Sequence, residues 1–177
     1  MKKILFFLMT VPMLLAFISC ANTENELVIN ADGTYTCEAV TFELPSGWEL
    51  DDAQDENGKD SGTVAEFSRE SGNFGSLDLS VISFDDMLER QAIYASGLDG
   101  RAAVSNYESN AVIIENGSGF LDTFLISDNT GNGTSLAHTD LYVVLDDNKV
   151  CAFKWVELPD NSVDDFSYFY NSIKIND

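Results

Sequence analysis

Basic residues are scarce in this chain. Nine lysines and arginines stand against thirty aspartates and glutamates, and the formal net charge is −21. Proteins bind phosphate groups mainly through Lys and Arg, so this balance argues against nucleic acid as a partner. Anionic lipid surfaces should also repel the folded body. An acidic surface of this kind serves solubility, a divalent cation or a basic partner.

Motifs of common enzymes are also missing. The single histidine, His138, lies in a stretch that alternates like a strand. A Ser-His-Asp system needs a histidine beside a nucleophile, but the chain has no G-x-S-x-G motif and no Walker-type glycine loop. One histidine with two cysteines cannot complete a standard tetrahedral zinc site. We expect His138 to be a solvated or hydrogen-bonded strand residue, with no catalytic residue in the chain.

One class of enzyme stays open as an alternative. Thirty acidic side chains make some facing pair of carboxylates inevitable, and such pairs catalyse glycoside hydrolysis. An open polar cleft that holds two facing carboxylates would favour an extracytoplasmic carboxylate-dependent hydrolase. A filled core with a flat or aromatic face would favour a binding domain.

Long apolar runs are limited to the start of the chain. Residues 4–17 are apolar apart from Thr10 and Pro12 and follow two lysines. A membrane span needs about 20 apolar residues, so this run is typical of a secretory leader. Residues 17–20 read FISC and resemble the bacterial lipobox, with Phe17 in place of the usual leucine.

The lipobox resemblance implies that residues 1–19 are removed and that Cys20 is diacylated and becomes the mature N-terminus. We therefore expect a membrane anchor on the cell membrane or outer membrane, facing away from the cytoplasm. The leader holds two basic and no acidic residues, which leaves the mature chain at −23. The alternative is an ordinary leader cut after Ala21.

Only three cysteines occur. If Cys20 is acylated, Cys37 and Cys151 remain as one pair, which in an exported domain favours a disulfide. The alternative is two small buried residues that never meet.

The remaining patterns predict one domain over residues 34–177, after a flexible tether over residues 20–33. Alternating segments predict strands, and tight turns between them predict a mainly antiparallel sheet. A capping-box pattern at residues 83–86 starts a helix with an apolar face of Leu88, Ala92 and Ala95. A second pattern, Ser162 with Asp165, starts a terminal helix. The class is α+β. The expected strands are 34–44, 63–69, 77–81, 111–114, 119–127, 136–145 and 149–156.

Two stretches resemble PsbP-like domains. Residues 41–48, TFELPSGW, are similar to the F-x-[IVL]-P-x-G-W motif at the start of that family, and residues 166–174, FSYFYNSIK, are similar to its terminal helix. The resemblance implies an α/β/α sandwich with two helices packed on the sheet. It also implies a non-catalytic accessory or binding module. Its ligand or protein partner cannot be named from these residues.

Calcium is the one cofactor worth weighing. An acidic loop supplies five carboxylates, although its glycine does not fit the EF-hand register. A calcium-dependent adhesion or envelope protein is therefore a further alternative, and a solvated loop is the simpler interpretation. The candidate ligands are Asp51, Asp52, Asp55, Glu56 and Asp60.

Overall fold

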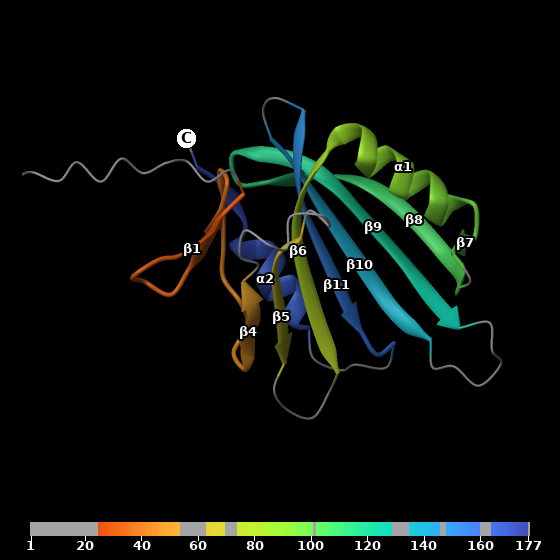
Figure 1. Cartoon of the computed structure of the whole chain (residues 1–177), viewed down its shortest axis with the longest axis horizontal. Helices are drawn as coiled ribbons and strands as arrows, with labels where there is room; N and C mark the ends of the chain where they lie inside the picture. The colour runs from red at the N-terminus through yellow and green to blue at the C-terminus, as the bar shows by residue number, and fades with distance from the viewer. Residues whose placement is uncertain are drawn as a thin grey trace, which may run out of the picture.

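The computed structural model describes residues 25–53, 63–69, 74–100, 102–128, 135–145, 148–159 and 164–176. This part of the chain forms two sheets and two helices (Figure 1). The elements are β1 (Leu27–Ile29), β2 (Tyr35–Cys37), β3 (Val40–Phe42), β4 (Trp48–Ala53), β5 (Thr63–Arg69), β6 (Gly75–Ser83), α1 (Phe84–Ala95), β7 (Leu98–Asp99), β8 (Ala102–Ile114), β9 (Gly117–Asp128), β10 (Leu136–Val144), β11 (Lys149–Glu157), α2 (Asp165–Ser172) and β12 (Lys174–Ile175).

The predicted α+β class with antiparallel pairing is confirmed. The larger sheet has the order β4-β5-β6-β11-β10-β9-β8-β7, and the smaller has the order β1-β2-β3-β12. All ladders within both sheets are antiparallel. Among the described residues, one parallel bridge, between Glu115 and Lys174, links them. Tight turns make this topology because they reverse the chain within a few residues.

Three expected boundaries differ from the structure. Strand β1 pairs with β2 and lies inside residues 20–33, which we expected to be tether throughout. The expected strand 34–44 is a hairpin, because Glu38 adopts a left-handed φ of 52° and turns the chain between β2 and β3. Strand β8 begins at Ala102 rather than near residue 111. A bulge with Asn106 at φ 56° breaks its alternation, so the sequence pattern hid its first half.

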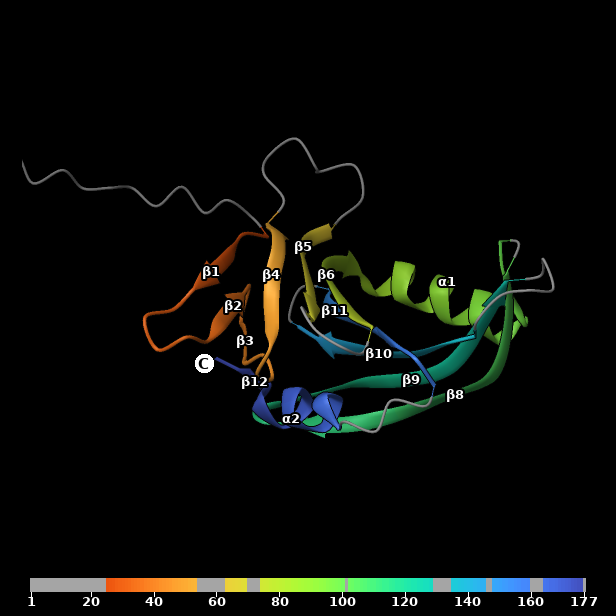
Figure 2. The same cartoon turned by 90° about the horizontal axis from the view of Figure 1, so that it is seen from below.

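The two helices pack on opposite faces of the larger sheet (Figure 2). Alternate residues of a strand point to opposite faces, and the core divides accordingly. On one face Phe153 and Trp155 pack with Phe169 of α2. On the other face Ala152 and Tyr142 pack with Met87 of α1. Neither helix is long and apolar enough to cross a membrane, and the described residues contain no other helix.

Helix α1 begins as predicted but buries the opposite side. Ser83 Oγ accepts the Asp86 backbone N–H at 3.0 Å, which confirms the capping box. The expected apolar face of Leu88, Ala92 and Ala95 is exposed, so that prediction is wrong. Met87 and Tyr94 are buried instead. The physical reason lies in the sheet below, whose buried carboxyl groups require polar partners from the helix.

Helix α2 buries one apolar stripe, and its N-cap differs from the predicted one. Phe169 and Ile173 are buried, with Phe166 and Tyr170 half-buried beside them, as expected from their helical spacing. The N-cap is Asp164, which accepts the Ser167 backbone N–H at 3.1 Å. The expected partner Ser162 lies outside the described residues.

Candidate functional site

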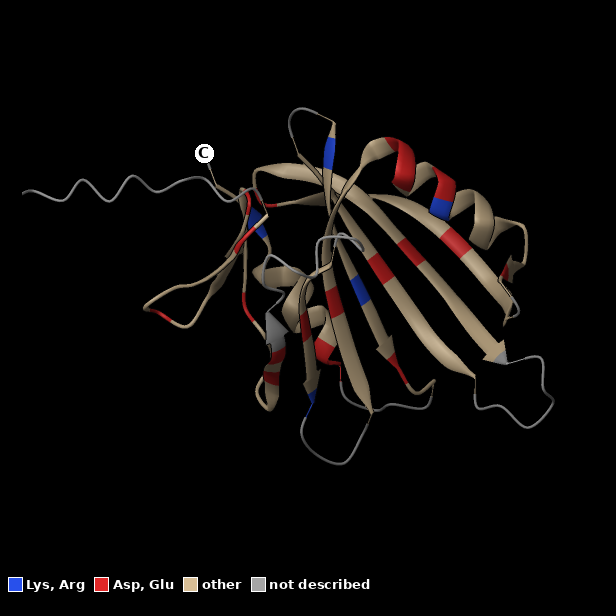
Figure 3. Ribbon diagram, viewed as in Figure 1, with Lys and Arg blue, Asp and Glu red and all other residues tan. Residues whose placement is uncertain are grey.

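A row of charged side chains crosses the larger sheet at one level. Asp78 of β6 pairs in register with Lys154 of β11, Lys154 with Asp140 of β10, and Asp140 with Asp122 of β9. We call these four residues the polar row. Acidic and basic positions accordingly form a band across the strands (Figure 3). Residues paired in register point to the same face, so the row forms one continuous strip.

The polar row faces α1. Gln91 Nε2 of that helix donates to Asp122 Oδ1 at 3.1 Å and to Ser109 Oγ at 3.2 Å. Tyr107 of β8 donates its hydroxyl to Asp122 Oδ2 at 3.2 Å. The row thus separates the apolar cluster around Met87 from the one around Tyr94. It explains why the helix presents polar side chains to the sheet.

Asp122 and Asp140 form a facing carboxyl pair that is completely buried. Both side chains are 0% exposed, and residues directly opposite on antiparallel strands have Cβ atoms about 4.5–5.5 Å apart. Tyr142 donates its hydroxyl to Asp140 Oδ2 at 3.2 Å, while Asp140 Oδ1 has no hydrogen-bond partner among the described residues. Two negative charges at this spacing repel each other, and burial strengthens that repulsion.

Burial favours the neutral form of both carboxyl groups. It raises the pKa of Asp140 to about 7, against the opposing effects of the Lys154 charge and the Tyr142 hydrogen bond. It also raises the pKa of Asp122, although the bonds from Ser109, Gln91 and Tyr107 limit the change. The pair therefore holds one proton under mildly acidic conditions, and Asp140 is the group that retains it.

The three tyrosines around the pair remain protonated donors. Burial and the nearby carboxylates raise the pKa of Tyr107 to about 12 and move the pKa values of Tyr94 and Tyr142 further upward. A phenol in this setting can donate a hydrogen bond to a carboxylate but cannot act as a base near neutral pH.

His138 lies in β10 as predicted, but it is packed rather than solvated. Its ring stacks on Phe124, with ring centroids 5.0 Å apart and an interplanar angle of 15°. Burial, together with the charge of Lys154, lowers its pKa to about 4. His138 is therefore neutral at physiological pH and adds no positive charge to the polar row.

The facing pair lacks the access that a carboxylate-dependent hydrolase requires. Retaining glycoside hydrolases hold two carboxyl groups about 5–5.5 Å apart. Those enzymes must also bring both carboxyl groups to a substrate, whereas Asp122 and Asp140 are sealed beneath α1. The arrangement can hold a proton, but it presents no carboxylate to a ligand.

The calcium ligands expected from the sequence are only partly visible. Asp51 is exposed in β4 and Asp52 follows it in the same strand, while Asp55, Glu56 and Asp60 lie outside the described residues. The part of the chain that the structure describes contains no group of three His, Cys, Asp or Glu side chains able to hold a metal. Calcium binding through the five residues stays a prediction.

The structure describes two of the three cysteines. Cys20 lies outside the described residues, so its acylation stays a prediction. Cys37 of β2 and Cys151 of β11 are both fully buried, and their thiols are hydrogen-bonded neighbours. Burial, and then the contact with Cys37, raises the pKa of the Cys151 thiol. The structure places them as neighbouring thiols without a bond between the sulfur atoms, and the disulfide stays a prediction.

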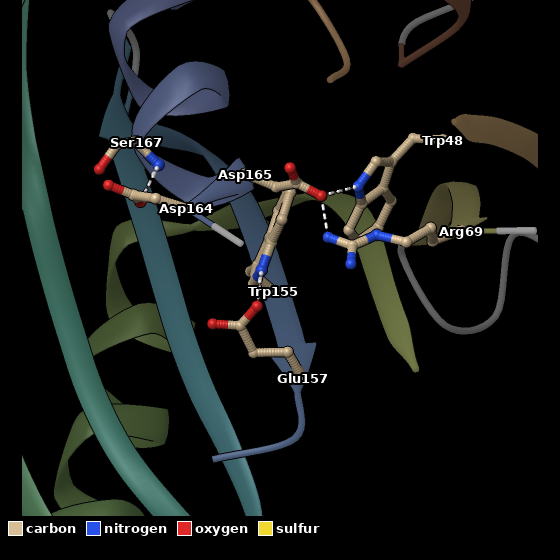
Figure 4. Close-up of polar contacts among 7 residues, drawn as sticks. All are labelled: Trp48, Arg69, Trp155, Glu157, Asp164, Asp165 and Ser167. Atoms are coloured by element: carbon tan, nitrogen blue, oxygen red, sulfur yellow. Dashed lines mark hydrogen bonds and ion pairs between the residues drawn. The ribbon is translucent and has the colours of Figure 1, made fainter. Parts of the chain in front are cut away.

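A second polar cluster joins α2 to the edge of the larger sheet (Figure 4). Asp165 forms an ion pair with Arg69 of β5 and accepts the Trp48 Nε1–H at 2.9 Å. The Trp48 ring lies against Trp155, with centroids 4.2 Å apart, and the Arg69 guanidinium lies over the Trp48 ring. Trp48 is buried. The role of this cluster is structural.

One surface combines an open strand edge with aromatic side chains. On its outer side β8 pairs with β7 only at Ala102 and Ala103. Within the described residues, the rest of that edge has no strand partner before the bridge at Glu115. The Ile113 side chain is 86% exposed and lies on the α1 face of β8, while its backbone carbonyl accepts the hydroxyl of Tyr170, from α2 on the other face, at 3.0 Å. Phe166 stacks on Tyr170. We call Ile113, Phe166 and Tyr170 with this edge the β8–α2 surface.

Sequence patterns missed most of these residues. A lone acidic residue inside an apolar strand was a usable signal for Asp122 and Asp140, because burial of a carboxylate is costly unless it has partners. Nothing in the sequence showed that the two would face each other. Tyr168 is exposed and donates its hydroxyl to Glu43 Oε2 at 2.8 Å, on the other side of α2 from Phe166 and Tyr170.

The antiparallel sheet with one helix on each face defines an α+β fold of the PsbP-like type. Among solved structures, the chain is similar to cyanobacterial PsbP (CyanoP) from Synechocystis sp. PCC 6803. The TM-score is 0.54 and the identity 12%, over 91% of this chain and 98% of that one.

The chain is also similar to a crystallised protein from Bacteroides thetaiotaomicron VPI-5482, with a TM-score of 0.52 and 9% identity over 87% of this chain. It spans about half the length of that protein, 49%. No protein-family model and no curated protein matches the chain. Identities this low establish a shared fold.

Proposed function

We propose that this chain is a lipid-anchored, extracytoplasmic accessory domain that binds a protein partner through the β8–α2 surface. The lipobox-like residues 17–20 support the anchor, and the resemblance to PsbP-like domains supports a non-catalytic module. The observation that carries the proposal is the exposure of Ile113, on the α1 face of an open strand edge that carries two aromatic side chains of α2 on its other face.

This surface has the composition of a protein interface. Interfaces concentrate aromatic residues at their centres, and an unpaired strand edge offers main-chain hydrogen bonds to an extended segment. On the α2 side of the edge the half-buried Phe166 and Tyr170 supply aromatic area, and on the α1 side Ile113 supplies an apolar contact. An isoleucine left 86% exposed on such an edge has no role in the core of this domain.

Charge indicates the chemistry of the partner. The exposed Glu108 and Glu115 lie on or directly after β8, and the mature chain carries −23 overall. A second copy of this chain would be repelled, whereas a basic segment would be attracted and its association accelerated. We therefore propose a partner that offers an extended basic segment with an apolar side chain opposite Ile113.

Site-specific photocrosslinking in native membranes tests this proposal. A photoreactive residue at position 113 should yield one discrete crosslinked species. The same residue at Glu89, exposed on α1, should not yield that species. A photoreactive residue in place of Tyr170 should yield the same species. Addition of the substitution Ile113→Asp to that variant should remove the species without changing the melting temperature. Equal crosslinking from positions 113 and 89, or no effect of Ile113→Asp, would refute the proposed surface.

The anchor has its own test. The mass of the mature N-terminal peptide should show a chain that begins at acylated Cys20, and Cys20→Ala should release the protein from the membrane fraction. A mature chain that begins at Asn22 without lipid would establish the ordinary secretory leader instead. That outcome would remove the anchor and leave the β8–α2 surface open to its own experiment.

A further inference from the structure

The buried carboxyl pair is the feature that the proposed binding surface leaves unexplained. Asp122 and Asp140 face each other beneath α1, and the helix closes directly over them through Gln91. One oxygen of the pair, Asp140 Oδ1, and one nitrogen above it, Arg90 Nη1, are buried without hydrogen-bond partners among the described residues. A fully buried polar atom without a partner costs stability, so such atoms call for an explanation.

Titratable and charged groups surround the pair on every neighbouring element. They are Asp78 (β6), Arg90 and Tyr94 (α1), Asp99 (β7), Tyr107 (β8), Asp122 (β9), His138 and Tyr142 (β10) and Lys154 (β11), with Asp86 one turn before Arg90 on α1.

The unfavourable charge lies on the two fully buried carboxyl groups. Asp122 and Asp140 are 0% exposed, whereas Asp78 and Lys154 are half-buried and Asp86 and Asp99 are exposed. The tyrosines and His138 are neutral at physiological pH. With one proton the pair carries a single negative charge, and without it the pair carries two negative charges out of contact with water. An excess charge in a low-dielectric interior is strongly unfavourable.

We propose that α1 is a proton-dependent latch, docked tightly while the Asp122–Asp140 pair holds one proton and loosened when that proton leaves. The latch is local because α1 is attached to the sheet mainly by Met87, Gln91 and Tyr94, which border the polar row. The α2 face has a separate aromatic core and is untouched by the change. Opening of α1 admits water to both carboxylates and relieves their repulsion.

The direction of the pH dependence follows from linkage. A carboxyl group whose pKa is higher in the docked state binds a proton more tightly there than in the open state. Docking is therefore strongest at low pH and weakens as pH rises from the ordinary Asp range toward neutrality. One proton released per opening event changes the opening equilibrium by about tenfold per pH unit. Above neutral pH both states are deprotonated and the dependence ends.

Amide hydrogen exchange across α1 tests the latch. After correction for intrinsic exchange rates, the opening equilibrium of α1 in the wild-type protein should rise about tenfold per pH unit between pH 5 and 7 and level off above pH 7. Strands β10 and β11 should show no such rise. A flat α1 profile in the wild-type protein would overturn the proposal.

Three variants distinguish a proton-dependent role of the Asp122–Asp140 pair from a purely structural role. Asp140→Asn keeps the shape of a protonated carboxyl and should make the α1 profile flat, whereas Glu89→Gln on the exposed side of α1 should follow the wild type. An Asp140→Asn profile that follows the wild type would refute the assignment. If that variant does not fold, a titration of the wild-type carboxyl groups followed by carbon-13 NMR decides.

The highest titration midpoint among these carboxyl groups should coincide with the pH at which the rise in α1 opening ends. The substitution Asp122→Asn should lower that midpoint. A different midpoint, or one unchanged by Asp122→Asn, would overturn the latch.

Discussion

At the scale of single residues, the chain places two reactive pairs where they have little contact with water. Asp122 and Asp140 share a polar strip, and Cys37 and Cys151 share the apolar core. The acids lie on the consecutive strands β9 and β10, whereas the cysteines unite β2 and β11, which are far apart in the sequence. In both cases the chemistry of one member depends on the other, through like-charge repulsion for the acids and through contact for the thiols.

The thiol contact makes the disulfide testable. We expect the mature protein, denatured without reductant, to show no free thiol. Loss of a disulfide that closes a loop of about 100 residues should lower the free energy of unfolding by up to about 4–5 kcal/mol in the chain-entropy model. Urea unfolding with and without reductant measures this change. The double variant Cys37→Ala/Cys151→Ala should be insensitive to reductant, and two titratable thiols in the wild-type protein would contradict the prediction.

The ion pair between Arg69 and Asp165 gives a second prediction at this scale. The two side chains are only 8% and 13% exposed, so Asp165→Asn should leave a nearly buried arginine without a counter-charge. We expect a loss of about 3–5 kcal/mol in the free energy of unfolding. The neighbouring Asp164→Ala removes only the helix cap and should cost about 1 kcal/mol. Equal losses in denaturant unfolding would show that Arg69 does not depend on Asp165.

At the scale of elements, helix α1 shows how a sheet can override helical patterning. Leu88, Ala92 and Ala95 have helical spacing, yet the helix turns Met87, Arg90, Gln91 and Tyr94 inward. The buried acids of β9 and β10 need donors, and the opposite face of α1 has acidic side chains that would repel them. Tertiary context of this kind decides between two candidate faces of one helix.

The contact between β9 and β10 gives a prediction for an element. Gly119 lies so close to the backbone of β10 that an added Cβ would overlap the Tyr142 carbonyl oxygen. Gly119→Ala should therefore force the strands apart and cost about 1–3 kcal/mol. The exposed neighbour Ser118→Ala should change stability by less than about 0.5 kcal/mol. Thermal unfolding of both variants checks this, and equal melting temperatures would show that the strands absorb the added methyl group.

At the scale of the whole molecule, net charge is the dominant property. A chain with a formal net charge of −21 repels itself, and this repulsion favours solubility and works against the compact state. Sodium chloride should screen this repulsion, and a gain of 1 kcal/mol would raise the melting temperature by about 2–4 °C for a chain of this size. Calorimetry at low and high salt measures the shift, and a melting temperature independent of salt would contradict it.

A comparison of calcium chloride with sodium chloride at equal ionic strength distinguishes calcium binding from simple screening of charge. If the loop that contains Asp51, Asp52, Asp55, Glu56 and Asp60 binds calcium, calcium chloride should raise the melting temperature beyond sodium chloride, and EDTA should reverse the gain. A melt unchanged by calcium and by EDTA would remove the calcium-dependent alternative.

Local patterns in the sequence determined the class of this protein. Alternating strands, turn residues, the Ser83–Asp86 cap and the stripe of α2 are set by neighbours along the chain, so the α+β fold could be predicted, and the lipobox-like Cys20 predicts its anchor. Only the tertiary structure decided which residues meet: Cys37 with Cys151, Trp48 with Asp165, and Asp140 with Asp122. These contacts depend on strand register, and because side chains alternate between faces, a slip of one residue would have turned either aspartate away from α1.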